Sequence, residues 1–64
     1  MITINEEPRA DVEGMTIKEI LFKLDPRMPI AVVKLNGEYL PRARWDEKVK
    51  DGDDVIVVYI IAGG

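Results

Sequence analysis

The residues from 55 to 61 are apolar without interruption, and all of them are β-branched or aromatic. A run of this kind is typical of a strand that is covered on both faces, and it is far shorter than the ~20 residues that span a bilayer. The chain has 64 residues, which suffices for one small domain only. We therefore expect a single domain over residues 1–64, built around a sheet with residues 55–61 as a central strand.

Alternation of apolar and polar residues at the start of the chain predicts a β-hairpin. Ile2 and Ile4 mark its first strand, Ala10 and Val12 its second, and the polar residues 5–8 lie between them. A hairpin at residues 2–12 would place two strands ahead of the first helix.

A capping box predicts that this helix begins at Thr16, because Glu19 follows three residues later. Asp25 and Pro26 end it, since the residue before a proline is pushed out of the α region. Phe22 lies off the apolar stripe, and it is either a rim residue or a contact for a partner. The stripe that we expect to cover the sheet consists of Ile17, Ile20, Leu21 and Leu24.

Two further strands are expected at residues 30–35 and 38–40, because Asn36 and Gly37 between them are a strong signal for a two-residue hairpin turn. Residues 41–50 are irregular, with Trp45 folding back as a plug of the core, and residues 51–54 form a turn. The order of elements predicts an α+β fold with a mixed sheet of four to five strands and one covering helix. This is the β-grasp, or ubiquitin-like, arrangement, in which the last strand lies parallel to the first.

The two faces of the last strand must differ, since one packs on the core and the other can meet a partner. The hydroxyl of Tyr59 would need a hydrogen-bond partner if it were buried, so we turn Val55, Val57 and Tyr59 outward. Ile56, Val58 and Ile60 would then face the core. The outward set is either an ordinary surface or, together with Phe22 and Arg42, an interface for a partner protein.

Composition excludes several classes of function. The net charge is −3 with scattered basic residues, which argues against a nucleic-acid surface. The sequence has no Cys and no His, so thiolate nucleophiles, His bases and the usual zinc sites are excluded. The acidic turn at residues 51–54 lacks the spacing of a calcium loop, and no pair of carboxylates suggests acid/base catalysis. Arg42 and Arg44 lie either in a solvated loop or opposite an anionic patch on a partner.

The sequence ends with Ala62, Gly63 and Gly64, which we expect to form a flexible tail at residues 62–64. Residues without bulky side chains can pass through a narrow channel on another enzyme. The carboxylate of Gly64 would be an anion at neutral pH and a poor electrophile, so it needs activation before a nucleophile can attack it. An acyl-adenylate formed with ATP is the natural route.

Several of these features together resemble the sulfur carrier proteins of thiamine biosynthesis, and with the helix at residues 16–24 the resemblance covers most of the chain. The shared pattern consists of Asn36 and Gly37, Pro41 and Arg42 followed by Trp45, the Asp51, Gly52 and Asp53 turn, and the ending at residues 61–64.

This resemblance implies a protein that is a co-substrate and not an enzyme. An E1-like enzyme would adenylate Gly64 with ATP and magnesium, and a protein persulfide would supply the sulfur of a thiocarboxylate. Thiazole synthase would then accept that sulfur. The chain itself would bind no cofactor and no metal. We expect it in the cytoplasm, with no contact to membrane or nucleic acid.

Other functions remain open from the sequence alone. The same tail chemistry serves the small subunit of molybdopterin synthase and carriers for tRNA thiolation. A different class of function is also compatible with it: the chain could be a ubiquitin-like modifier of lysines, or an interaction module whose glycines are incidental.

Overall fold

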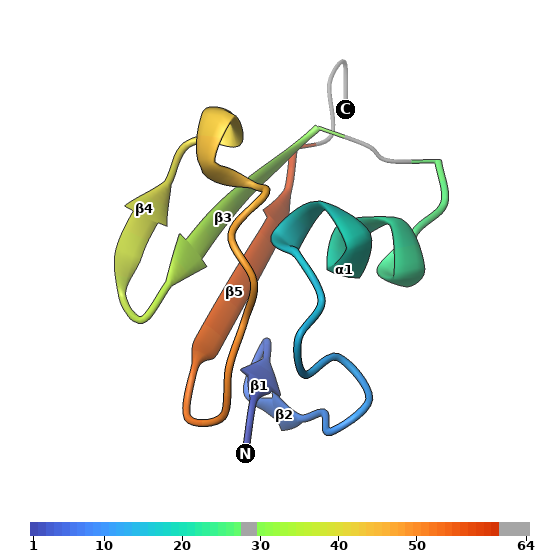
Figure 1. The fold of residues 1–64 in the computed structure, drawn as a ribbon. Coiled ribbons are helices and arrows are strands. Elements are labelled where there is room, and N and C mark those ends of the chain that lie inside the picture. The colour runs from blue at the N-terminus through green and yellow to red at the C-terminus, as the bar shows by residue number, and fades with distance from the viewer. Residues whose placement is uncertain (28–29, 61–64) are drawn as a thin grey trace.

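The computed structural model describes residues 1–27 and 30–60, and in this part of the chain one α-helix packs on a mixed sheet (Figure 1). The elements are β1 (Thr3–Ile4), β2 (Glu7–Pro8), α1 (Ile17–Leu24), β3 (Ala31–Leu35), β4 (Glu38–Leu40), the 3₁₀ helix η1 (Arg42–Arg44) and β5 (Asp54–Tyr59). The sheet has five strands in the order β2-β1-β5-β3-β4. This arrangement confirms the predicted α+β fold of the β-grasp type.

β5 is the central strand of the sheet. It runs parallel to β1, with Thr3 opposite Asp54, and antiparallel to β3, with Leu35 opposite Val55. The parallel pairing of the last strand with the first is therefore as predicted. A parallel pair needs a long crossover, and here the helix and the other three strands lie between β1 and β5 in the chain.

The capping box forms as the sequence predicts. The hydroxyl of Thr16 accepts the backbone N–H of Glu19 at 3.1 Å, and a carboxylate oxygen of Glu19 accepts the N–H of Thr16 at 2.8 Å. At the other end the N–H of Asp25 donates to the carbonyl oxygen of Leu21 at 2.9 Å. α1 thus begins and ends where the caps predict.

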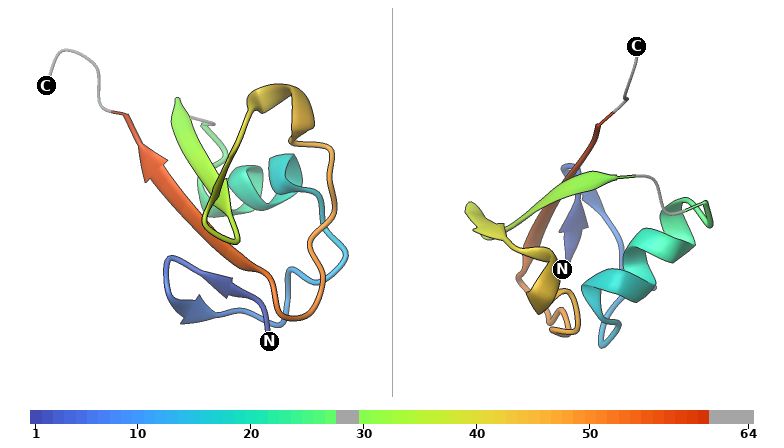
Figure 2. Two further views of the ribbon diagram at one scale, coloured as in Figure 1. Left: turned by 90° about the vertical axis from the view of Figure 1, so that its left-hand side faces the viewer. Right: turned by 90° about the horizontal axis from the view of Figure 1, so that it is seen from above.

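The core lies between α1 and one face of the sheet, and Figure 2 shows the helix on one side of the sheet. The buried apolar residues are Ile2, Ile4, Val12, Ile17, Ile20, Leu21, Val33, Leu40, Val49, Val55 and Val57. Full burial of a Val, Leu or Ile side chain contributes about 1.5–3 kcal/mol, so these core residues supply most of the stabilisation of the fold.

The first hairpin is tighter than the alternation predicts. Asn5 and Glu6 have φ angles of 51° and 71°, and this left-handed conformation lets two residues close the turn. β1 therefore pairs with β2, and the predicted second strand at Ala10 and Val12 is wrong. Val12 nevertheless belongs to the core and is completely buried, because it packs there from a turn and not from a strand.

Trp45 lies half-buried against the core, as predicted, at the end of η1. Its indole N–H donates to the carbonyl oxygen of Leu40 at 3.3 Å. The irregular segment is held further along by Val49, whose N–H donates to the carbonyl oxygen of Met15 at 2.9 Å. These bonds fix the connection between β4 and β5 across the start of α1.

Candidate functional site

The predicted reactive end of the chain follows directly after the central strand. β5 ends at Tyr59, and the N–H of Ile60 still donates to the carbonyl oxygen of Ile30 at 2.8 Å. Ala62, Gly63 and Gly64 lie outside the described residues, so the flexible tail at residues 62–64 stays a prediction. The structure defines the surface around the last described part of the strand.

The predicted orientation of β5 is wrong. Val55 and Val57 are 0% and 6% exposed and belong to the core, whereas Val58 and Ile60 are 54% and 49% exposed. The aromatic ring of Tyr59 packs against the core although the residue is only partly buried. An aromatic residue near the end of a strand can bury its ring and still leave its hydroxyl near water, so the hydroxyl did not require the outward face.

The side of the sheet opposite α1 carries a row of apolar side chains. Residues directly opposite each other on neighbouring strands point to the same face, and the register pairs Val32 with Val58 and Lys34 with both Ile56 and Tyr39. Ile30 and Ile60 continue this register by one more pair. We call the side chains on this side the outer sheet face: Ile30, Val32, Lys34, Tyr39, Ile56, Val58 and Ile60. This face is apolar around the single cation of Lys34.

Phe22 and Arg42 do not lie on the outer sheet face. Phe22 is exposed on α1, next to Lys18. Arg42 lies in η1, with its guanidinium carbon 5.8 Å from the centre of the Trp45 ring, within range of a cation–π contact. Lys18 lines one surface depression together with Phe22 and another together with Arg42. The five predicted interface residues therefore separate into two buried valines, Tyr59 at the strand end, and two residues on the helix side.

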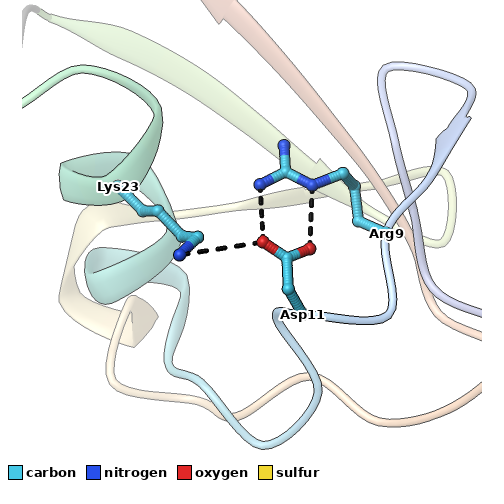
Figure 3. A network of polar contacts seen from close by, with 3 residues as sticks. All are labelled: Arg9, Asp11 and Lys23. Atoms are coloured by element: carbon cyan, nitrogen blue, oxygen red, sulfur yellow. Dashed lines mark hydrogen bonds and ion pairs between the residues drawn. The ribbon is translucent and has the colours of Figure 1, made fainter.

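A three-residue polar network lies outside this region and has a structural role (Figure 3). Arg9 donates two hydrogen bonds of 2.9 Å to the carboxylate of Asp11, and the ammonium of Lys23 lies 3.7 Å from the same group. The hydrogen bond from Arg9 is the main cause that lowers the pKa of Asp11 to about 2. The network ties the loop after β2 to α1, and each charge in it has an opposite charge nearby.

The described residues contain no group of acidic side chains arranged to hold a metal ion. Among them, no helix is both long and apolar enough to cross a membrane. Burial raises the pKa of Tyr59, and the carboxylate of Asp25 adds to the shift, so its phenol stays protonated at neutral pH. What the geometry offers is an exposed apolar face of the sheet beside the end of β5.

Comparison with known proteins identifies the family. The ThiS family model matches residues 2–64. The chain belongs to the ThiS family. Sulfur carrier protein ThiS of Escherichia coli is 34% identical over 64 residues, which cover 98% of this chain and 97% of that protein. Sulfur carrier protein ThiS of Thermus thermophilus is 38% identical over 65 residues, which cover 100% of both chains.

A solved ThiS structure has the same fold. The crystal structure of the thiamine biosynthesis protein ThiS from Geobacter metallireducens is similar with a TM-score of 0.73 and 34% identity, over 98% of this chain and 97% of that one. The protein is therefore a sulfur carrier of thiamine biosynthesis, and as a ThiS-family carrier it is not an enzyme. Family membership selects the thiamine pathway from the alternatives that the sequence left open.

The sequence also contains a signal for the outer sheet face, in charged residues on β3 and β5. Asp54 begins β5 and is exposed, and Lys34 on β3 is exposed as well. Since side chains alternate along a strand, each of these charges assigns the even-numbered positions of its strand to the solvent side. Alternation from Asp54 therefore predicts that Val58 and Ile60 face solvent, as they do in the structure.

Proposed function

We propose that the carboxyl carbon of Gly64 is the atom that carries sulfur in this ThiS-family protein. The observation that carries the proposal is the absence of Cys from the sequence, which removes every side-chain thiol that could hold the sulfur. The α-carboxylate of Gly64, which follows the central strand after a short tail of small residues, is then the acceptor. Residues 1–64 act as one domain whose tail at residues 62–64 reaches into partner enzymes.

Activation requires a partner, because a carboxylate is a poor electrophile. An E1-like adenylating enzyme binds ATP and magnesium, a carboxylate oxygen of Gly64 attacks the α-phosphorus, and pyrophosphate leaves. The terminal sulfur of a protein persulfide then displaces AMP and forms an acyl disulfide with Gly64. A second thiol, on the donor or the adenylating enzyme, attacks the sulfur on the donor side, so that a disulfide forms there and a thiocarboxylate is left on Gly64. Thiazole synthase accepts this sulfur. The reaction places the protein in the cytoplasm, where ATP and these enzymes are available.

The outer sheet face is the docking surface that we propose for these partners, in place of the buried Val55 and Val57. Val58 and Ile60 expose apolar area on the strand that leads into the tail, and apolar patches rimmed by polar residues mark interaction sites. Lys34 supplies the one positive charge of this face, and it complements an acidic residue on the partner. Phe22 and Arg42 form a separate contact on the helix side.

Intact-mass spectrometry tests the proposed attachment site. Incubation with the adenylating enzyme, ATP, magnesium and a persulfide donor is expected to add the mass difference of one oxygen replaced by sulfur. A variant without Gly64 is expected to gain no sulfur while its melting temperature stays nearly unchanged, since a terminal residue contributes few contacts.

The controls separate the carrier function from the competing ones. Omission of ATP should abolish the mass change in the full chain. An unchanged mass with a competent partner would contradict the proposal, as would sulfur acceptance by the variant without Gly64. Isopeptide-linked products with other proteins would instead indicate a modifier.

A further inference from the structure

The central strand bonds to its neighbours through alternate residues. Asn36 N–H donates to the carbonyl oxygen of Asp54 and Ile60 N–H to that of Ile30, each at 2.8 Å. In an antiparallel pair, hydrogen-bonded and non-bonded positions alternate, so even-numbered residues of β5 bond to β3. The N–H and C=O groups of the odd-numbered residues, including Tyr59, point the other way, toward β1.

β1 covers only the first part of that second edge. It pairs with β5 at Asp54 and Val55, and the chain then turns away because Asn5 and Glu6 take left-handed φ angles. The side chain of Asn5 supplies one more bond, since its Oδ1 accepts the N–H of Val57 at 2.8 Å. Figure 1 shows β1 beside the start of β5 only.

Beyond Asn5 the edge of β5 is open. Among residues 1–27 and 30–60, no hydrogen-bond partner is found for the carbonyl oxygen of Val57 or for the N–H and carbonyl oxygen of Tyr59. The same stretch presents Val58 and Ile60 on the outer sheet face. It is an unpaired strand edge in the middle of the sheet, next to exposed apolar side chains.

We infer that an extended segment of the adenylating enzyme adds as a strand along Val57 and Tyr59, bonding to this open edge of β5. Unpaired strand edges bind extended segments through main-chain hydrogen bonds, while flanking side chains provide specificity. The inference rests on the proposed function, because the occupant is the enzyme that acts on Gly64. It is continuous with the docking surface proposed above.

The position of the edge favours this occupant. Gly64 follows Tyr59 by five positions in the sequence, and an extended chain covers at most roughly 3.3–3.6 Å per residue. An added strand at Tyr59 therefore binds within one tail length of the reacting carbon, and it fixes the direction in which the chain leaves the sheet. The outer edges of β2 and β4 belong to strands that do not lead into the tail. β2 also includes Pro8, which has no N–H to donate.

Backbone N-methylation tests the inference, because a chain of 64 residues is accessible to total chemical synthesis. An N-methyl group on Tyr59 removes the N–H donor and places a methyl group in the path of an added strand, while the bonds to β3 remain. Ala10 offers a matched control. It is exposed in the loop after β2, outside the outer sheet face, and no hydrogen-bond partner is found for its N–H among the described residues.

The measurements are affinity for the adenylating enzyme with ATP and magnesium, thiocarboxylate yield, and melting temperature, with the synthetic unmodified chain as reference. We expect N-methyl-Tyr59 to bind about tenfold more weakly or worse, and N-methyl-Ala10 to bind within about twofold of the reference. Both modified chains should melt within a few degrees of the reference.

If the reference is processed and N-methyl-Tyr59 binds as tightly as the reference, strand addition is overturned and the proposed function stands. Equal weakening by both N-methyl groups would also overturn it. If the reference accepts no sulfur at all, the proposed function fails and this inference fails with it. Loss of self-association in N-methyl-Tyr59, measured by light scattering, would make a second copy of the chain the occupant instead.

Discussion

Asp11 lies between two cations that come from different parts of the chain, Arg9 after β2 and Lys23 on α1. Its pKa is lowered to about 2, mainly by the hydrogen bond from Arg9. A carboxyl group with a lowered pKa in the folded state stabilises the protein above its unfolded pKa, and this contribution is lost as the pH falls through the folded value. For Asp11 the loss falls between about pH 4 and pH 2.

We predict that Asp11→Asn lowers the melting temperature at pH 7 by no more than a few degrees, because the pair is solvent-exposed and screened. The difference from the unmodified chain should shrink as the pH is lowered from 4 to 2, and it should also shrink in high salt. Thermal unfolding followed by circular dichroism at several pH values checks this. A difference that is constant down to pH 2 would show that the charge of Asp11 is not the cause.

Asp53 is the buried charged residue of the described chain, and the fold satisfies it completely. Its two carboxylate oxygens accept the side-chain N–H of Asn36 at 3.1 Å and the backbone N–H of Lys50 at 3.0 Å. The amide oxygen of Asn36 in turn accepts the N–H of Asp54 at 2.9 Å. A buried carboxylate is costly unless it is hydrogen-bonded, so these bonds allow Asp53 to join the β3–β4 turn to the start of β5.

At the scale of elements, α1 depends on its first turn. A helix of eight residues is too short to be stable alone, and the capping box satisfies two backbone donors at its start. We predict that Thr16→Ala destabilises the protein by about 0.5–2 kcal/mol. For a domain of this size each kcal/mol corresponds to about 4–8 °C in melting temperature.

Thr16→Ser is the matched control for the cap, because it keeps the hydroxyl and removes only the methyl group. It should retain most of the stability in the same thermal melts. Equal destabilisation by both substitutions would contradict the role of the hydroxyl. It would instead point to the strand-like bridge between Thr16 and Lys48.

Elements with a local chemical cause were predictable from the sequence. The box of Thr16 and Glu19 defines the start of α1, and Asn36 and Gly37 close the β3–β4 turn with φ angles of 53° and 83°. The order of elements was enough to place β5 parallel to β1. In each case neighbouring residues, or a rule of topology, determine the result without knowledge of side-chain packing.

Features that depend on long-range register were not predictable in the same way. The expected second strand at residues 10–12 does not form, because Asn5 and Glu6 close a tight turn that alternation of polarity does not reveal. A strand that is apolar at every position likewise carries no alternation of its own. Which face of β5 is buried follows from its neighbours, and the open edge beyond Asn5 follows from where β1 ends.

At the scale of the whole molecule, one face of the sheet makes the core with α1 and the other remains available for partners (Figure 2). Two adjacent valines on β5 lie on these two opposite faces of the sheet. Val57 is 6% exposed and belongs to the core, and Val58 is 54% exposed on the outer sheet face. The same substitution at both positions therefore separates folding from docking.

We predict that Val57→Lys costs about 3–5 kcal/mol, because it buries an unpaired charge, and this is a large share of the roughly 5–15 kcal/mol that typically stabilises a domain. Val58→Lys should change stability by about 0.5 kcal/mol or less. It should nevertheless weaken binding to the adenylating enzyme about tenfold or more, since it places a charge in the centre of an apolar interface. Thermal melts and thiocarboxylate yields measured on the two variants test both halves, and full activity of a folded Val58→Lys protein would exclude the outer sheet face as the docking surface.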